Sequence, residues 1–234
     1  FKEFNFIDSY VKEQLLYYVY LNSGLKINYN NSLLYSQNGL KDLIESNTNN
    51  QYLHYPIIHL KDKDIEIGFT HGNQYGEEYY SFVNGQNTIH GGTHLAAFKE
   101  AIVKTLRDFY KKDFNTSDVR ASIIGAISIR MQNPVFESQT KTKLGSTEFN
   151  NKSTIRIFIN DFIKLHLDNF LHKNSDIAEI LLNRIMQSEK ERKDMAGIKK
   201  IASQRVKKAN LHNKKLRDCK IHYSDKKIDI LEKN

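Results

Sequence analysis

Cysteine, proline and long apolar runs are scarce in this chain. Among its 234 residues are one cysteine and two prolines. The single cysteine, Cys219, excludes an internal disulfide framework and favours a reducing compartment. No apolar run approaches the ~18 to 20 residues that span a bilayer, and no signal-peptide pattern opens the chain, so we expect no membrane segment. Because the chain opens on Phe1, we expect it to be a segment of a longer protein.

Several catalytic signatures are also missing. The sequence contains no Gly-rich phosphate loop with Gly-Lys-Ser/Thr, no Gly-x-Gly-x-x-Gly, no paired-carboxylate cluster and no nucleophile elbow. A nucleotide contacted by this chain would therefore have most of its binding site elsewhere.

The composition is that of a globular protein with a strongly basic end. Hydrophobic residues make up 39% and aromatic residues 11%, enough for one large or two small domains with a proper core. Residues 184–220 carry thirteen lysines and arginines against four acidic residues, a net charge of +9, whereas the whole chain has +8. Such a segment either binds a polyanion or presents a solvated helix face, and both interpretations stay open.

Hydrophobic periodicity predicts an α+β organisation. We expect a helix over 8–22, capped by Asp8 or Ser9, then a strand over Leu25–Tyr29 and a short helix over Asn38–Ser46. The runs PIIHL, IEIGFT and YYSFVN are typical of strands, and the turn Lys61–Asp64 predicts that the first two form a hairpin.

The chain from Thr93 onward predicts three helices and an interior strand. A helix is expected over Thr93–Lys111, and Ser122–Met131 is apolar enough for a strand covered on both faces. Two further helices follow, the first capped by Ser153 or Thr154 and the second near Asn174 or Ser175. The second helix has an expected buried stripe that becomes thinner toward the C-terminus, made of Ile177, Ile180, Leu181 and Ile185, then Met195, Ile198, Ile201 and Val206.

The segment Ser81–His94 is unusual because it places Gly91 and Gly92 just before a predicted helix. Backbone N–H groups there could face a phosphate. The alternative is that the glycines only make the turn and Thr93 caps the helix. His90 and His94 have a spacing that zinc sites use, but no further ligands are evident.

The stretch FESQTKTKLGS, Phe136–Ser146, has no apolar side chain in its middle. A solvated loop is one interpretation. The other is that Gln139 donates a hydrogen bond and Lys141 or Lys143 meets a phosphate. A lysine on a loop between rigid elements suits a sensor, because its contact is made or lost as domains move.

Three segments together resemble the B subunit of bacterial type IIA DNA topoisomerases: YYSFVNGQNTIHGGTHLAAFKEAI, DVRASIIGAISIRMQNPVFESQTKTKLGS and LHNKKLRDC. LLYYVYLNSGLKI resembles the end of that subunit's ATPase domain, and MAGIKKIASQRVKKANLHNKKLRDC is more similar to the B subunit of topoisomerase IV than to that of DNA gyrase. The resemblance implies a transducer domain with the ribosomal protein S5 domain 2-like fold. It also implies that Gln139 and Lys141 contact the γ-phosphate of ATP, while Lys143 receives no role.

This resemblance implies a domain order and a set of partners. The end of the GHKL ATPase domain would occupy 1–36, the α+β transducer body 37–152, a long helical arm 153–218, and the start of a linker to the TOPRIM domain 219–234. The full enzyme would use ATP and Mg²⁺, bind DNA, pair with the A subunit of topoisomerase IV or of gyrase, and dimerise through its B subunit in the bacterial cytoplasm at the nucleoid. The fragment would hold no catalytic or metal-binding residue and neither hydrolyse ATP nor cleave DNA alone. Its possible DNA-facing residues are Lys199, Lys200, Arg205, Lys207 and Lys208.

Two departures from the family pattern, and two rival interpretations, remain. His90 stands where the family often has Glu, and Asp118–Ser122 reads Asp-Val-Arg-Ala-Ser instead of Asp-x-Arg-Glu-Gly, which leaves Arg120 without its expected acidic neighbour. A non-catalytic nucleic-acid-binding module with an S5-like fold is one rival. A mismatch-repair MutL-like protein is the other, although GGTH and LHNKKLRDC argue against it.

Overall fold

The computed structural model describes residues 5–48, 52–150 and 153–211, with side chains up to Val206. Two compact units divide the chain between Ser188 and Glu189. The elements, in order, are α1 (Asp8–Leu21), β1 (Lys26–Tyr29), β2 (Ser32–Tyr35), α2 (Leu40–Thr48), β3 (Ile58–Lys61), β4 (Ile65–His71), β5 (Glu78–Val83), β6 (Gln86–Asn87), α3 (Thr93–Tyr110), α4 (Thr116–Arg120), β7 (Ile123–Ile129), β8 (Glu148–Phe149), β9 (Ser153–Thr154), α5 (Ile155–Lys173) and α6 (Ser175–Leu211).

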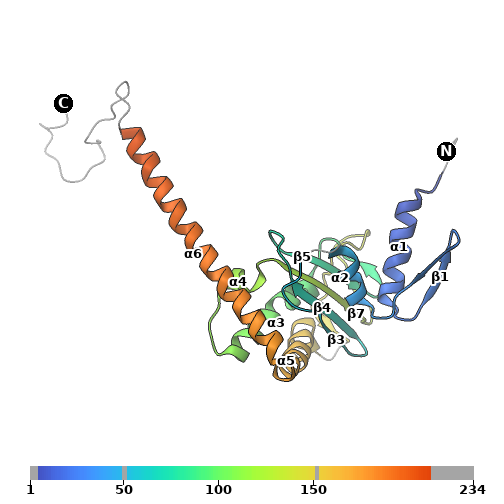
Figure 1. Cartoon of the computed structure of the whole chain (residues 1–234). Coiled ribbons are helices and arrows are strands. Elements are labelled where there is room, and N and C mark those ends of the chain that lie inside the picture. Colours follow the sequence, from blue (N-terminus) through green and yellow to red (C-terminus); the bar gives the residue numbers. More distant parts are fainter. Residues whose placement is uncertain (1–4, 49–51, 151–152, 212–234) are drawn as a thin grey trace, which may run out of the picture. The chain divides into compact units, whose positions relative to one another are not determined.

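The first unit is built on a five-stranded mixed sheet with the order β3-β4-β7-β5-β6 (Figure 1). β3 and β4 form the predicted antiparallel hairpin, and β7 lies between β4 and β5, antiparallel to the first and parallel to the second. Side chains of β7 alternate between two core clusters: Ile123 and Ile127 face one, whereas Ile124 and Ala126 face the other. The prediction of an interior strand is confirmed, because a strand buried on both faces needs a nearly continuous apolar run.

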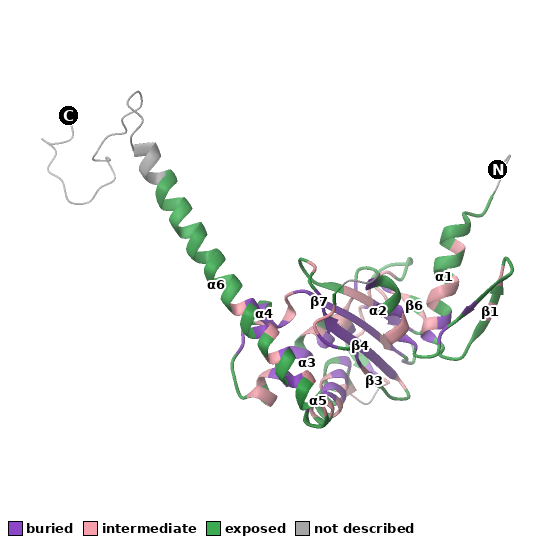
Figure 2. Ribbon diagram, viewed as in Figure 1, coloured by how far each residue is buried: buried purple, intermediate pink, exposed green. Residues whose placement is uncertain are grey.

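Helices cover both faces of the sheet, as Figure 2 shows by the buried residues along the strands and the inner helix faces. On one face, α2 packs through Leu40, Leu43 and Ile44. On the other, α3 and α5 pack on each other and on the sheet through apolar residues at helical spacing, among them Phe98 and Ile159. The architecture is therefore α+β, as expected.

Helices α1 and α5 begin close to the predicted residues, but the predicted N-cap residue is right only for α5. Thr154 caps α5 by accepting a hydrogen bond from the N–H of Ile157 at 3.2 Å. For α1, the expected cap by Asp8 or Ser9 is wrong, because Ile7 stands at the N-cap position without a side-chain hydrogen bond. The carboxylate of Asp8 instead accepts from Tyr29 and Asn30, each at 2.8 Å, and so ties α1 to the β1–β2 hairpin.

The buried stripe of α6 is shorter than the sequence suggests. Leu181 and Ile185 are fully buried, and the hydroxyl of Tyr110 donates to the carbonyl of Ala178 at 2.6 Å, which fastens α6 to α3. Ile180 is 41% exposed, which corrects its expected burial.

From Lys190 to Val206 every side chain of α6 is exposed (Figure 2). The apolar side chains of this stretch share that exposure, because the described part of the second unit contains no other element to cover them. No described helix has an apolar stretch long enough to cross a membrane.

Two histidines are buried within the first unit. The hydroxyl of Tyr55 hydrogen-bonds to Nδ1 of His71, and Nε2 of His71 donates to the carbonyl of Val119 at 2.8 Å. His94 lies in α3 with its Nε2 3.2 Å from the hydroxyl of Thr88. Burial lowers the pKa of each histidine to about 4. Both rings are therefore neutral in the native state near pH 7.

The buried histidines predict a loss of stability in mild acid. Below pH ~6.5 the unfolded chain protonates them while the native state does not, so the free energy of unfolding falls as the pH drops toward 4. Each histidine contributes a slope of at most about 1.4 kcal/mol per pH unit. Urea unfolding at pH 7, 6 and 5 measures this slope. The variant His94→Gln should show a shallower slope than wild type; equal slopes in the two proteins would contradict the assignment.

Candidate functional site

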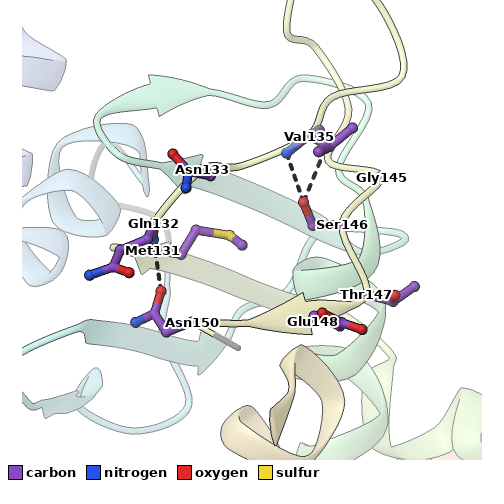
Figure 3. A pocket seen from close by; sticks show the side chains of 9 residues that line it. All are labelled: Met131, Gln132, Asn133, Val135, Gly145, Ser146, Thr147, Glu148 and Asn150. Atoms are coloured by element: carbon purple, nitrogen blue, oxygen red, sulfur yellow. Dashed lines mark hydrogen bonds between the residues drawn. The ribbon is translucent and has the colours of Figure 1, made fainter. Parts of the chain in front are cut away.

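The segment Phe136–Leu144, between β7 and β8, forms a narrow loop with two hydrogen-bonded legs. An antiparallel bridge joins Phe136 to Leu144, and the N–H of Glu137 donates to the carbonyl of Lys143 at 3.0 Å. Below them, Ser146 closes the base: Val135 N–H donates to its hydroxyl at 2.7 Å, and the hydroxyl lies 3.4 Å from the carbonyl of Val135 (Figure 3). A loop without apolar residues at its tip is thus held by backbone pairing further down.

The tip carries the two residues that the sequence singles out. The N–H of Lys141 donates to the carbonyl of Ser138 at 3.0 Å, which closes a tight turn, and Lys141 has a φ of 55°. Gln139 and Lys141 are exposed, and together with Phe136, Glu137 and Ser138 they line a shallow cavity of about 310 Å³. Neither side chain makes an ion pair or a side-chain hydrogen bond within the described residues. Both are therefore available to a ligand or a neighbouring domain.

Lys143 has a different environment from Lys141. Its ammonium group lies 2.9 Å from the carboxylate of Glu137, on the opposite leg of the loop. Both partners are about half exposed, so the pair contributes only about 0–1 kcal/mol of stability. Its main consequence is that the charge of Lys143 is offset within the loop and the charge of Lys141 is not.

The second leg of the loop is fastened to the start of α3. His90 N–H donates to Thr142 at 2.9 Å, Leu144 N–H to Gly91 at 3.0 Å, and Thr93 N–H to Leu144 at 3.2 Å. These bonds form a short parallel ladder in which Gly92 pairs with Leu144. We call residues 90–93 and 142–144, joined in this way, the loop clamp. It brings together two unusual segments that the sequence shows separately, and sequence reasoning missed the contact because no local pattern encodes it.

Gly92 is required at the centre of the loop clamp. Its φ of 135° is a conformation that residues with a side chain rarely adopt. A Cβ atom there would stand less than 3 Å from the backbone O, N and Cα of Leu144. The N–H groups of Gly91 and Thr93 both donate to protein carbonyls, so the turn interpretation of the two glycines is favoured over a phosphate site.

Thr93 does not cap α3, which corrects the expected cap. Gly92 occupies the N-cap position, and no side chain caps the helix there. The hydroxyl of Thr93 instead donates to the carbonyl of Ser146 at 2.6 Å.

The histidines of this region do not come together as metal ligands. His94 is buried and faces Thr88, whereas His90 is exposed. Across residues 5–48, 52–150 and 153–211, no three His, Cys, Asp or Glu side chains form a cluster that could hold a metal ion. We therefore assign no metal ligand among the described residues.

The departure at Asp118–Ser122 is compensated by residues elsewhere in the chain. Glu77 lies 3.2 Å from Arg120 and 3.2 Å from Lys99, so it supplies the acidic partner that Ala121 cannot. Ser122, which replaces the family's glycine, has a φ of 59°. Its hydroxyl accepts a hydrogen bond from Arg184 at 2.9 Å, which links α6 to the sheet. Arg184 is thus part of the packed unit and not of an exposed basic surface.

The basic residues of α6 do not all lie on one helix face. Lys199, Lys200 and Arg205 are exposed, and Lys207 and Lys208 lie in α6 beyond the described side chains. Arg205 is seven residues after Ile198 and shares its face, whereas Lys200 lies on the far side. Contact with one flat polyanion would therefore engage only part of this set.

A groove of about 340 Å³ lies beside the base of the loop (Figure 3). Among its lining residues the one charged side chain is that of Glu148, an acid. The described lining of the groove therefore offers no side-chain cation to an anion.

Comparisons with known proteins agree with the resemblance. A family model described as DNA gyrase B matches residues 29–218. The B subunit of DNA topoisomerase 4 from Borreliella burgdorferi is 36% identical over 225 residues, covering 96% of this chain and 37% of the relative. The B subunit of DNA gyrase from Clostridium acetobutylicum is 28% identical, covering 89% of this chain and 35% of the relative. The chain thus spans little more than a third of these relatives.

Among solved structures, the 43K ATPase domain of Thermus thermophilus gyrase B, in complex with an aminocoumarin, matches with a TM-score of 0.71 and 22% identity. The match covers 86% of this chain and 58% of the other. At this level of identity the likeness establishes the fold.

Gly92→Ala should lower the free energy of unfolding by about 2–4 kcal/mol, since the alanine is both strained and pressed against Leu144. Urea unfolding of the chain measures the loss. Gly85→Ala is the matched control, because Gly85 has a φ of 82° with no atom within 4 Å of the added Cβ, and it should cost only about 1 kcal/mol. Equal losses in the two variants would show that the contact with Leu144 does not matter.

Proposed function

Because the chain belongs to the DNA gyrase B family, we propose that it is the transducer region of the B subunit of an ATP-dependent type II DNA topoisomerase. In this role it relays ATP binding and hydrolysis to DNA gate movement and strand passage. The higher identity to a topoisomerase IV relative (36%) than to a gyrase relative (28%) supports topoisomerase IV as the parent enzyme. The small mixed sheet with helices on both faces supports the S5 domain 2-like assignment.

The observation that carries the proposal is the contrast between the two loop lysines. Lys141 stands exposed, with no ion pair in the described structure, at the tip of a loop held at both legs. Lys143, two residues later, is paired with Glu137 at 2.9 Å. A phosphate sensor needs one cation that is presented at a defined place and left without a partner. Lys141 meets that requirement, and Gln139 beside it can donate a hydrogen bond to the same γ-phosphate.

Lys141 would act by electrostatics. Its ammonium group is a compact point charge that can approach the γ-phosphate and stabilise the negative charge there as the phosphoryl group leaves. Comparable single contacts are worth about 3–4 kcal/mol in the transition state. The chain supplies only this part of the site, so the remaining nucleotide contacts and the Mg²⁺ ligands are proposed to lie in other parts of the full enzyme.

A continuous packed path leads away from the loop. The loop clamp fixes the second leg on α3, and α3 packs along α5, with Arg156 of α5 3.0 Å from Glu100 of α3. α5 is followed after Asn174 by α6, which Tyr110 of α3 holds through the carbonyl of Ala178. A displacement of the loop on nucleotide binding or hydrolysis would therefore move α3, α5 and the base of α6 together.

The remaining roles are part of the same proposal. Residues 1–36 would end the ATPase domain, 37–152 would form the transducer body, 153–218 the helical arm, and 219–234 the start of the linker to the TOPRIM domain. The parent would act in the bacterial cytoplasm at the nucleoid, and its partners would be DNA, the A subunit, and a second copy of the B subunit. The separate β1–β2 hairpin, packed with α1, supports a boundary close to residue 36.

Lys141→Ala in the full-length B subunit, in complex with the A subunit, should lower the kcat of ATP hydrolysis about 10²- to 10³-fold and abolish strand passage. Lys143→Ala is the matched control, and it should stay within about threefold of wild type because Lys143 faces Glu137. Steady-state ATPase and DNA relaxation assays measure both variants, with the isolated 234-residue chain, from which no turnover is expected, as the blank. Near-normal turnover in Lys141→Ala would refute the proposed role.

We also propose that five basic residues of α6 face DNA: Lys199, Lys200, Arg205, Lys207 and Lys208. The exposed positions of the first three support this. So does the concentration of positive charge, since residues 199–208 contain five basic residues and no acidic one. Contacts of this kind bind phosphates without reading sequence and release counterions.

Duplex binding by the chain should weaken steeply with salt, by a slope of about −0.9 in log K against log salt for each phosphate contacted. Replacing Lys199, Lys200 and Arg205 by Gln should make that slope shallower by about 1–2, because these side chains lie on different faces of the helix and only part of the set can contact one duplex. Fluorescence anisotropy between 50 and 200 mM salt measures it, and Lys190→Gln with Lys193→Gln is the control, since Lys193 already pairs with Glu189 at 2.6 Å. A wild-type slope near zero would mean that the basic residues only face solvent and do not contact DNA.

Tight duplex or RNA binding in a parent without an ATPase domain would favour the non-catalytic binding module instead.

A further inference from the structure

On the α3 side of the loop clamp, residues 90–93, the side chain of Thr93 hydrogen-bonds to the base of the loop. The other ties are backbone hydrogen bonds from His90, Leu144 and Thr93, which a substitution cannot delete singly. The hydroxyl of Thr93 donates to the carbonyl of Ser146, 53 residues further along the chain, at 2.6 Å. Because Gly92 is the N-cap residue, this hydroxyl does not serve its own helix.

Because Ser146 lies where the two legs of the loop meet, the bond from Thr93 restrains the tip as well. Ser146 stands at the base of the second leg, and its own hydroxyl holds Val135 of the first leg (Figure 3). The polar ties of the first leg run to the second: Glu137 bonds to Lys143, and Gly145 N–H donates to Val135 at 2.9 Å. The polar restraint on both legs therefore passes through residues 142–146 to the N-terminus of α3, while Phe136 and Leu144 add apolar packing on the core.

We propose that Thr93 is a positioning residue for the phosphate-sensing lysine. Its hydroxyl fixes the second leg of the loop on α3 and so determines where the ammonium group of Lys141 stands. This inference rests on the proposed function of Lys141 and extends it to a residue that touches no nucleotide. Misplacing a reacting group by about 1 Å can cost up to 10²-fold in rate, so the loss of a single hydrogen bond at the loop base has a measurable effect.

The activity test uses the full-length B subunit in complex with the A subunit. Thr93→Val keeps the shape of the side chain and removes the hydroxyl, and it should lower kcat about tenfold or more with KM within about threefold. Thr93→Ser restores the hydroxyl and should recover turnover to near wild type. Thr147→Val is the matched control: Thr147 is exposed next to Ser146, and its hydroxyl makes no hydrogen bond in the described part of the chain.

A double variant separates positioning from a general loss of stability. In a Lys141→Ala background, Thr93→Val should cause no further loss of kcat, because there is no lysine left to position. A second loss of the same size would overturn the proposal and assign Thr93 a purely structural role. Normal kcat in Thr93→Val alone would overturn it as well.

Hydrogen–deuterium exchange on the 234-residue chain tests the clamp without any nucleotide. The amides of Leu144 and His90 should exchange faster in Thr93→Val, and in Thr93→Ala as an independent variant, but not in Thr93→Ser or Thr147→Val. Unchanged exchange at these amides would overturn the positioning role even if turnover falls. Normal turnover in Lys141→Ala, in contrast, would refute the proposed function itself, and the exchange data would still decide whether Thr93 holds the loop.

Discussion

The close approach of Gly92 to the backbone of Leu144 is the contact on which the candidate site depends. It lets the start of α3 and the second leg of the loop form a parallel ladder, although 52 positions of sequence separate them. The loop has no apolar residue at its tip, so burial cannot order the tip itself. Its legs are held by the packing of Phe136 and Leu144 on the core and by backbone hydrogen bonds to a helix that is anchored there through Phe98 and its neighbours. A polar, solvated tip can thus be presented on a rigid base.

This arrangement also explains why two lysines in one short loop are not equivalent. The leg-to-leg pairing places Lys143 beside Glu137, whereas the turn at Ser138–Lys141 directs the tip into solvent. The ion pair of Lys143 contributes little to stability in water. Its effect is on charge, since it leaves Lys141 as the loop's cation without a described partner. The position of that cation follows from the clamp, and its charge is not offset by any described residue of the loop.

Where the sequence departs from the family pattern, the tertiary structure supplies the missing group from a distant segment. Glu77 takes the place of a carboxylate absent beside Arg120, and Ser122 adopts the backbone conformation of a glycine while its hydroxyl binds Arg184. Glu77 joins α4 to α3, since it also pairs with Lys99, and the bond from Arg184 to Ser122 joins α6 to the start of β7.

The sequence by itself determined the longer helices and strands and most of their buried faces. A run that is apolar on both faces predicted the interior strand β7, and spacings of three and four predicted α3 and α5, because these patterns reflect which side of a regular element is buried. It also marked Gln139 and Lys141, through a motif that resembles a known family.

Only the tertiary structure decided which contacts these residues make and which of them are exposed. The pairing of Gly92 with Leu144, the ion pair of Lys143, the bond from Thr93 to Ser146 and the exposure of Ile180 all depend on segments far apart in the chain. Hydrogen bonds and ion pairs of this kind produce no repeating residue pattern in the sequence. Each is made once, between two positions that only the packed fold brings together.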